Sequence, residues 1–214
     1  MYDRDMARPS LTASDIEAVA AQGKSAEVIV PQGSIITDEA RELAERLGVR
    51  IRVEGAVDAP SGSNRQPVCI GCDHGGFELK QNLKRFITEC GYEVHDIGTD
   101  SSDSVDYPDF AAVVARAVAS GAAWRGIMID AAGIGSCMAA NKVAGVRAAL
   151  CYDRATARNS REHNNANVLT LGARMHTSGE AREIVRVWLE TDFGGGRHQR
   201  RLDKITDLET ETDA

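Results

Sequence analysis

Two loops, each after an apolar segment, carry the residues best suited to acid–base chemistry. The apolar run 125–129 ends at Asp130, and a turn without bulky side chains follows at 131–135. A second apolar run precedes Asp73 and His74, which are followed by two glycines. Carboxylates and imidazoles exchange protons with substrates, and glycines let an anionic group approach backbone N–H groups and the positive end of a helix. On these residues alone, each loop could equally be an ordinary strand-to-helix turn.

A third candidate is the polar segment 161–167, REHNNAN, which ends a predicted helix. His163 has a carboxylate on one side and Asn164 on the other. Such neighbours can hold a histidine in one tautomer and let it titrate near neutrality, as acid–base catalysis requires. The structural alternative is an asparagine helix cap beside a solvated histidine.

Arginines form a basic minority in an acidic chain. Guanidinium groups match phosphate oxygens in a bidentate manner, so a cluster of them favours a phosphorylated ligand. The alternative is that Arg200 and Arg201 pair with Asp203 and Asp207 on a solvated helix, and for Arg200 we favour it. The candidate cluster is Arg174, Arg197, His198, Arg200 and Arg201.

These residues are placed by alternating strands and helices from Pro67 onward. Such alternation predicts a parallel sheet with helices on both faces, and a ligand crevice where the first and third strands end, near Asp73 and Asp130. Ser136 is expected to cap a helix that starts near Cys137. The predicted strands are 68–71, 92–97, 125–129, 146–151 and 168–171, and the predicted helices are 77–90, 109–120, 155–164, 179–190 and 197–208.

The first 66 residues predict a smaller α/β unit. Residues 1–10 are expected to be disordered, 11–53 to form a small module and 54–66, rich in Gly, Ser and Pro, to be a linker to a domain spanning 67–214. Thr12 and Asp15 have the spacing of a capping box. The module is predicted to contain strands at 26–30 and 49–53 and a helix at 38–47.

Composition limits the function classes. A chain of 214 residues with 43% hydrophobic residues can form one medium domain and a small one. A net charge of −7 argues against a general nucleic-acid or anionic-membrane binder. No apolar stretch approaches the roughly 20 residues of a membrane helix, and five cysteines without framework spacing fit a reducing cytoplasm. No motif indicates a metal, and the pair Gly133 and Gly135 is weak evidence for a dinucleotide, so no cofactor is expected.

Five blocks in order resemble the type B ribose-5-phosphate isomerases and the related galactose-6-phosphate isomerase subunits. They are DHGGFELK, GTDSSDSVDYPDFA, GIGSCMAANKVAGVRAALCYD, REHNNANVLTLGAR and GGRHQRRLDKI, and they cover residues 67 to about 208. The resemblance implies a Rossmann-like fold with a flavodoxin-like order of strands, and interconversion of phosphorylated aldoses and ketoses without a metal. It also implies a homodimer or homotetramer whose sites combine residues of two chains.

The resemblance also implies a role for individual residues. His163 would open the furanose ring with Asn164 beside it, and the Gly133, Ile134 and Gly135 amides would stabilise the enediolate oxyanion. The remaining contacts to the sugar and its phosphate would come from Asp73, His74, Tyr107, Arg174, Arg197 and Arg201.

Two positions depart from the family pattern. Many members have a cysteine base where this chain has Asp130, and a threonine or serine where it has Ala132. Some actinobacterial relatives use a glutamate at the position of Ser136. We therefore expect an isomerase of ribose-5-phosphate in which Asp130, with a pKa raised by the apolar strand beneath it, is the base. The alternatives are a phosphosugar-binding paralogue without turnover and an isomerase of a tetrose or hexose phosphate.

Residues 11–53 resemble, more weakly, modules attached to bacterial microcompartment enzymes, above all in VIVPQGSIITDEARELAERLGVRI. This implies docking to shell or cargo proteins inside a microcompartment. A small extension packed on its own dimer is an equal alternative.

Overall fold

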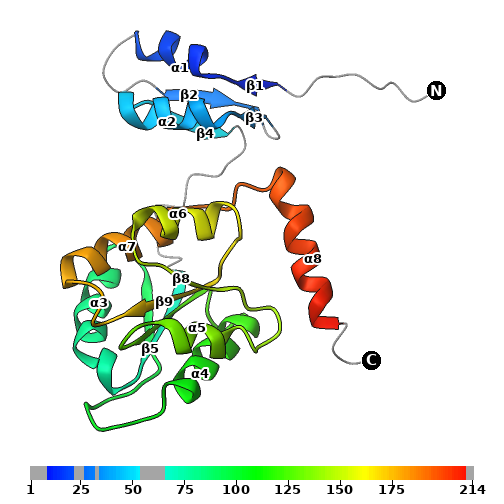
Figure 1. The fold of residues 1–214 in the computed structure, drawn as a ribbon. Helices are drawn as coiled ribbons and strands as arrows, with labels where there is room; N and C mark the ends of the chain where they lie inside the picture. The colour runs from blue at the N-terminus through cyan, green and yellow to red at the C-terminus, as the bar shows by residue number, and fades with distance from the viewer. Residues whose placement is uncertain (1–8, 22–26, 32–33, 54–65, 211–214) are drawn as a thin grey trace. The chain divides into compact units, whose positions relative to one another are not determined.

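The computed structural model describes residues 9–21, 27–31, 34–53 and 66–210, which form two compact units divided between Asn64 and Arg65. The predicted linker 54–66, except for its last residue, and the first eight residues of the predicted disordered segment lie outside the described residues. Each unit is described separately (Figure 1).

The smaller unit contains two pairs of parallel strands and two helices. The predicted strands and the helix at 38–47 are confirmed, and the Thr12 N–H donates to the Asp15 carboxylate at 2.8 Å, as the capping spacing predicts. The prediction that residues 1–10 are disordered was wrong for its last residue, because Ser10 of β1 pairs with Ile35 of β3. Two-residue strands have no periodicity, so the sequence could not reveal them. The elements are β1 (Ser10–Leu11), α1 (Ala13–Ala20), β2 (Glu27–Val30), β3 (Ile35–Ile36), α2 (Asp38–Leu47) and β4 (Arg50–Val53).

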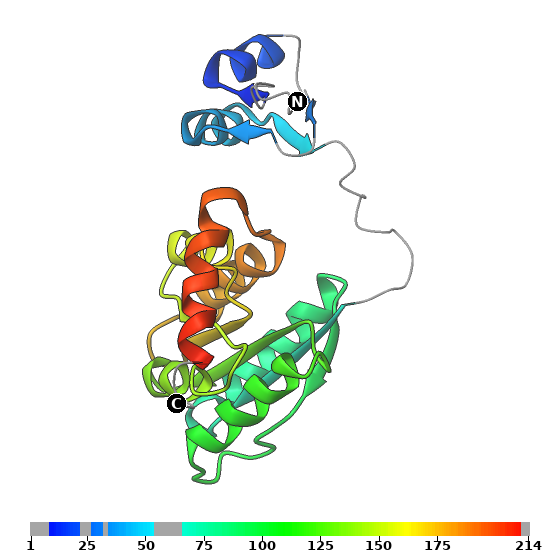
Figure 2. The same cartoon turned by 90° about the vertical axis from the view of Figure 1, so that its right-hand side faces the viewer.

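The larger unit contains a five-stranded parallel sheet in the order β6-β5-β7-β9-β8 with helices on both faces, as predicted (Figures 1 and 2). Its strands are β5 (Pro67–Cys72), β6 (Glu93–Asp96), β7 (Arg125–Asp130), β8 (Ala148–Leu150) and β9 (Val168–Gly172). Its helices are α3 (Phe77–Glu89), α4 (Tyr107–Ala119), α5 (Ile134–Ala140), α6 (Arg154–Glu162), α7 (Ser178–Glu190) and α8 (Gln199–Thr210).

The strand order differs from the flavodoxin-like one at one edge. Counted within this sheet the order is 2-1-3-5-4, whereas a flavodoxin-like sheet runs 2-1-3-4-5. The chain therefore passes over one position to form β8 and returns to insert β9. A right-handed return crossover requires α6 to lie on the same face as α3, and the contacts of α7 with both α3 and α6 agree with this.

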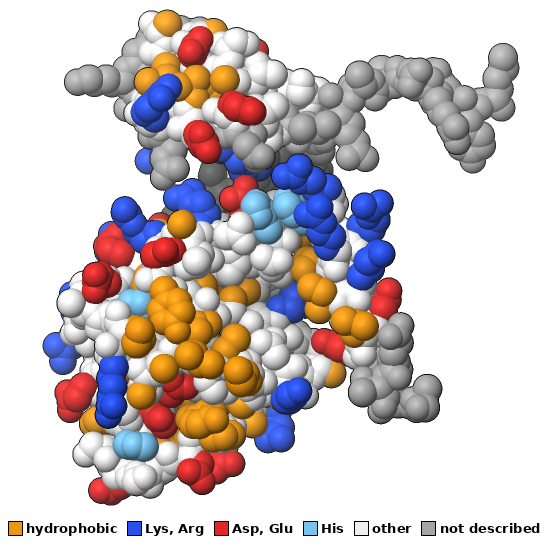
Figure 3. All heavy atoms as spheres, in the orientation of Figure 1, with side chains coloured by type: hydrophobic (Ala, Val, Ile, Leu, Met, Phe, Trp, Pro, Cys, Tyr) orange, Lys and Arg blue, Asp and Glu red, His pale blue; other side chains and the backbone are white. Residues whose placement is uncertain are grey.

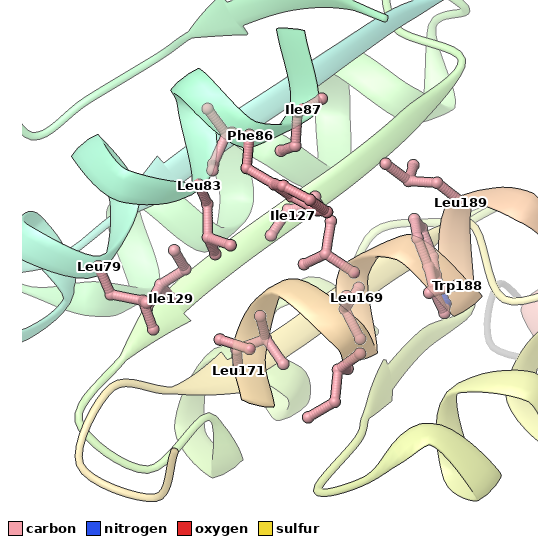
Figure 4. Close-up of a cluster of buried hydrophobic side chains, with 14 of the residues drawn as sticks. Leu79, Leu83, Phe86, Ile87, Ile127, Ile129, Leu169, Leu171, Trp188 and Leu189 are labelled. Carbon is pink, nitrogen blue, oxygen red and sulfur yellow. The ribbon is translucent and has the colours of Figure 1, made fainter. Parts of the chain in front are cut away.

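Two apolar cores cover the two faces of the sheet. The larger core packs α3 and α7 against the sheet, with Leu83, Ile127, Leu169 and Trp188 fully buried at its centre (Figure 4). The smaller core packs α4 and α5 against the opposite face. Helix α4 begins at Tyr107, two residues before the predicted start, because Pro108 is tolerated in a first helical turn.

A buried arginine caps the last turn of α7. Arg125 is 3% exposed, stacks on the Trp124 ring at 3.9 Å and donates to the carbonyl oxygens of Trp188 at 2.6 Å and Leu189 at 2.9 Å. A cation at a helix C-terminus satisfies carbonyl groups that have no intrahelical donor.

We expect Arg125→Met to lower the free energy of unfolding by about 1–3 kcal/mol, because buried carbonyl groups lose their donor while the side-chain volume is kept. Urea unfolding measures this change. Arg116→Met, at an exposed position of α4, is the matched control. Equal stability of the two variants would contradict the capping role.

Candidate active site

The loop after β7 closes around the carboxylate of Asp130. One carboxylate oxygen, Oδ1, accepts from the backbone N–H groups of Ala132, at 2.7 Å, and of Gly133. The other, Oδ2, accepts from the Ser136 N–H at 3.0 Å and from the Ser136 hydroxyl at 2.5 Å. A carboxylate offers about four acceptor positions, and all four are used here. The side chain is 5% exposed.

This arrangement corrects the predicted start of α5. The helix begins at Ile134 and not near Cys137, and Ser136 lies within its first turn, where it does not act as the cap. Gly133 occupies the cap position with φ +79°, a conformation that favours glycine. The sequence suggested a serine cap because serine is a common one, but Asp130 supplies the acceptor from the preceding strand.

Two backbone donors remain at the start of α5. The N–H groups of Ile134 and Gly135 have no acceptor among the described residues. The ring of Tyr107 packs on Gly135, since an added Cβ there would lie 2.5 to 2.7 Å from its atoms. These N–H groups at a helix N-terminus can bind an oxyanion beside Tyr107.

Asp73 and His74 lie at the end of β5, next to the end of β7 in the sheet. Asp73 is 6% exposed and accepts from the Gly76 N–H at 3.0 Å. Burial raises the pKa of the Asp73 carboxyl, and the nearby charge of Asp130 acts in the same direction. His74 is exposed, with Nδ1 3.2 Å from the carbonyl oxygen of Val105.

Arg174 follows β9, which pairs with β7 on the other side. Its backbone N–H donates to the Ala131 carbonyl at 3.1 Å, and its side chain is exposed. The structure therefore brings six groups to one edge of the sheet, here called the carboxyl-edge cluster: Asp73, His74, Tyr107, Asp130, the N–H groups of Ile134 and Gly135, and Arg174. The Gly133 N–H, predicted as a further donor to the oxyanion, donates to Asp130 instead.

The remaining predicted residues form a second group, here called the His163 cluster: His163, Asn164, Arg197, His198 and Arg201. The rings of His163 and His198 stack with centroids 4.3 Å apart and an angle of 9° between their planes. Burial lowers the pKa of His198, and so do the charges of His163 and Arg197. Figure 3 shows histidine side chains beside a group of Lys and Arg side chains where α8 begins.

Asn159 orients the imidazole of His163. Its amide nitrogen lies 2.8 Å from Nδ1. Because an amide N–H can only donate, Nδ1 accepts, and the neutral ring carries its proton on Nε2. His163 therefore presents Nε2–H as its available donor, which suits a general acid.

The two clusters lie at opposite ends of the strands. Asp130 is the last residue of β7, whereas the Gly126 N–H near the start of β7 donates to Asn167, four residues after His163. Helix α6 runs from the end of β8 back toward the start of β9 and so takes His163 away from the carboxyl edge. A six-residue strand spans roughly 17 Å. One chain therefore does not bring His163 to Asp73.

Among the described residues, no group of histidine, cysteine, aspartate or glutamate side chains has the arrangement of a metal site. In the same part of the chain, no helix is long and apolar enough to cross a membrane.

Comparisons with known proteins identify the family of the larger unit. Residues 68–205 match the ribose/galactose isomerase family. The chain is 48% identical over 143 residues to a putative sugar phosphate isomerase of Bacillus subtilis, covering 66% of this chain and 96% of that protein. It is 46% identical over 142 residues to ribose-5-phosphate isomerase B of Escherichia coli, covering 66% and 95%.

A solved structure of ribose-5-phosphate isomerase B from Clostridium thermocellum superposes with a TM-score of 0.68 at 49% identity, covering 69% of this chain and 99% of that one. The matched region is the larger unit. The chain belongs to the ribose/galactose isomerase family and is a sugar-phosphate isomerase. The resemblance read from the five sequence blocks is confirmed, and the resemblance of the N-terminal module to microcompartment proteins stays a prediction.

Sequence reasoning missed three features of the candidate site. It did not predict that Ser136 binds Asp130, that His198 stacks on His163, or that Asn159 sets the tautomer of His163. The last could have been found, because Asn159 and His163 are four residues apart and therefore neighbours on one helix face.

Proposed function

We propose that this enzyme interconverts ribose-5-phosphate and ribulose-5-phosphate through an enediolate. The observation that carries the proposal is the pair of unused N–H groups at Ile134 and Gly135, bordered by Tyr107 and adjoining the strand end that carries Asp73. An enediolate needs such donors where its oxygen becomes negative. Further support comes from a ribose-5-phosphate isomerase B of Mycoplasma genitalium, 44% identical, whose structure contains ribulose-5-phosphate.

In this reaction, His163 relays a proton through Nε2: the ring oxygen gains a proton as the C1–O4 bond breaks, and the anomeric hydroxyl gives up its proton as the C1=O1 bond forms. A carboxylate then removes the proton from C2, and the oxyanion at O1 accepts hydrogen bonds from the α5 amides. His74, Arg174, Arg197 and Arg201 hold the phosphate, whose charge suits guanidinium groups. The sequence assigns the carboxylate role to Asp130, and that assignment stays a prediction.

We propose further that each site is completed by a second copy of the chain, which supplies the His163 cluster to the carboxyl-edge cluster. Exposed apolar side chains support this. Tyr107, Ile134, Met138, Tyr152 and Met175 are 39% to 65% exposed, and Figure 3 shows hydrophobic side chains gathered over the face of the larger unit that includes α5. Patches of this kind mark interfaces.

Helix α8 gives independent support. It lies along the outside of the larger unit and exposes Ile205 and Leu208 (Figures 1 and 2). Leu202 of this helix is buried, whereas Ile205 and Leu208 are 44% and 61% exposed, so a second copy of the chain could bury more of its apolar surface.

Turnover of ribose-5-phosphate by the purified protein, followed by appearance of the ketose, tests the proposal. A panel containing a tetrose phosphate and a hexose phosphate tests the second candidate, an isomerase of another substrate. A relative from Pectobacterium atrosepticum, 38% identical over 139 residues, is named D-erythrulose-4-phosphate isomerase, which favours including the tetrose. Binding without turnover of any member would leave only the phosphosugar-binding alternative.

Gly135→Ala should raise KM by roughly tenfold with little change in Tm, which corresponds to loss of about 1.4 kcal/mol of binding. The added Cβ would meet the Tyr107 ring, and this half-exposed ring can swing aside. Gly179→Ala, where nothing lies within 4 Å of the added carbon, is the control. An unchanged KM would show that Tyr107 does not line the sugar site.

The N-terminal unit is proposed to dock the enzyme to a microcompartment shell or to its cargo, in a cytoplasmic compartment. Its support is that it forms a compact unit of its own with a separate core of Leu11, Ile16 and Val30. Deletion of residues 1–60 with localisation beside a shell protein tests this. Unchanged localisation would favour an extension that packs on its own assembly.

A further inference from the structure

Two carboxylates end neighbouring strands of the sheet, and their surroundings differ. Asp130 at the end of β7 accepts four hydrogen bonds from its own loop. Asp73 directly after β5 accepts one at 3.0 Å from the Gly76 N–H, and the Gly75 N–H contributes more weakly. Both side chains are buried, at 5% and 6% exposure.

The two carboxylates differ in how many hydrogen bonds they already accept, and this difference determines which one can readily take a proton. A general base must direct a lone pair at the carbon-bound hydrogen. Asp130 would first have to release an amide or the Ser136 hydroxyl, and each released bond costs about 0.5–1.5 kcal/mol, or more where the donor stays buried and unpaired.

Asp73 has the opposite environment. Among the described residues, its Oδ1 accepts from the Gly76 N–H at 3.0 Å and the weaker Gly75 N–H is the one further donor to the carboxylate, against the four hydrogen bonds that Asp130 accepts. Burial raises the pKa of its carboxyl, which brings the carboxylate closer in basicity to what removal of a carbon-bound proton requires.

Asp73 also borders the loop that would bind the oxyanion. A Cβ added to Gly75 would lie 3.3 Å from Asp73 Oδ1 and 3.7 Å from the Ala131 side chain. The glycine therefore lies between Asp73 and the 131–135 loop. Asp73 and the Ile134 and Gly135 N–H groups thus follow the ends of two neighbouring strands, β5 and β7, at one edge of the sheet.

We propose that Asp73, and not Asp130, is the catalytic base of the isomerisation. This inference rests on the proposed function. The C2–H bond of the open-chain aldose breaks, its proton forms the O–H bond of the Asp73 carboxylic acid, and its electron pair forms the C1=C2 bond as O1 becomes negative. Asp73 then returns the proton to C1, while the O2 hydroxyl proton moves to O1. No electron acceptor is needed.

Asp130 then acts as a positioning residue. Its carboxylate holds the Gly133 and Ser136 N–H groups and thereby leaves the Ile134 and Gly135 N–H groups directed at the substrate. In this chain an internal anion therefore fixes the 131–136 loop.

The experiment compares Asp73→Asn with Asp130→Asn in the full-length chain. Three quantities are measured: kcat and KM for ribose-5-phosphate, incorporation of solvent deuterium into the product, and inhibition by inorganic phosphate. The amide oxygen introduced by Asp73→Asn can still accept from the Gly76 N–H, so this variant should fold. We expect it to lose about 10²–10⁴-fold in kcat and to incorporate no deuterium, with phosphate inhibition unchanged.

Asp130→Asn should lower Tm and keep more than roughly a tenth of kcat, because the loop loses order but the base remains. If this variant does not fold, Asp130→Ser, which keeps an oxygen acceptor and has no carboxylate, is measured instead. Near-normal turnover of Asp73→Asn would overturn the assignment. So would complete loss of turnover and deuterium incorporation in a folded Asp130 variant. Failure of the wild-type protein on every sugar phosphate would instead contradict the proposed function.

Discussion

His163→Ala should fold normally and lose about 10²–10⁴-fold in kcat/KM for ribose-5-phosphate, because ring opening loses its general acid. The side chain is half-buried and its polar contact is with Asn159, so its removal exposes no apolar core. Turnover measured with the furanose substrate checks the loss. His95→Ala, which removes a surface histidine paired with Glu93, is the control and should keep full activity.

Mixing two inactive variants tests where the two clusters meet. His163→Ala and Asp73→Asn each retain one intact cluster, so a mixed dimer contains one site with both clusters intact. Refolding an equal mixture should restore roughly a quarter of wild-type activity, since half of the dimers are mixed and each has one working site. No recovery in the mixture, with both variants dimeric, would show that a site is built from a single chain.

Gly133→Ala should lower the free energy of unfolding by about 2–5 kcal/mol, from a left-handed backbone and from overpacking. The added Cβ would lie 2.5 Å from a Leu150 methyl carbon and 2.9 Å from the Leu171 carbonyl carbon, which belongs to rigid β9. The kcat should fall as well, because the added Cβ would force the loop around Asp130 to shift. Denaturant unfolding measures the stability, and kcat measures the shift of the loop.

Gly121→Ala separates the two causes. Gly121 has φ +77°, close to that of Gly133, but nothing lies within 4 Å of its added Cβ. It should therefore cost only the backbone contribution, about 1–2 kcal/mol. If both substitutions lower the free energy of unfolding by the same amount, close packing around Gly133 does not contribute to the stability of the loop.

The sequence was sufficient to predict the strands and helices of the larger unit and the edge of the sheet at which the candidate site lies. Apolar runs that end at Asp73 and Asp130 predicted neighbouring strand ends, because parallel strands end at one edge of a sheet. The exchange of β8 and β9 was not predictable, since strand order depends on the path of crossovers and both strands are short apolar segments. That exchange determines on which face α6 lies.

The hydrogen bonds inside the candidate site were harder to predict from the sequence. The spacing of Asp130 and Ser136 does not indicate a hydrogen bond until the loop conformation is known, and Gly133 with its positive φ determines that conformation. The base assignment to Asp130 relied on position alone. Which carboxylate has free lone pairs is a property of three-dimensional packing.

The absence of a cysteine at position 130 has a chemical consequence. Burial raises the pKa of Cys69 to about 12 and of Cys72 and Cys151 to about 11, so these thiols remain protonated and unreactive. With a carboxylate at position 130, this loop offers no thiol there for peroxide to oxidise or for a haloacetamide to alkylate. Thiol modification should then fall on the half-buried Cys90 and Cys137.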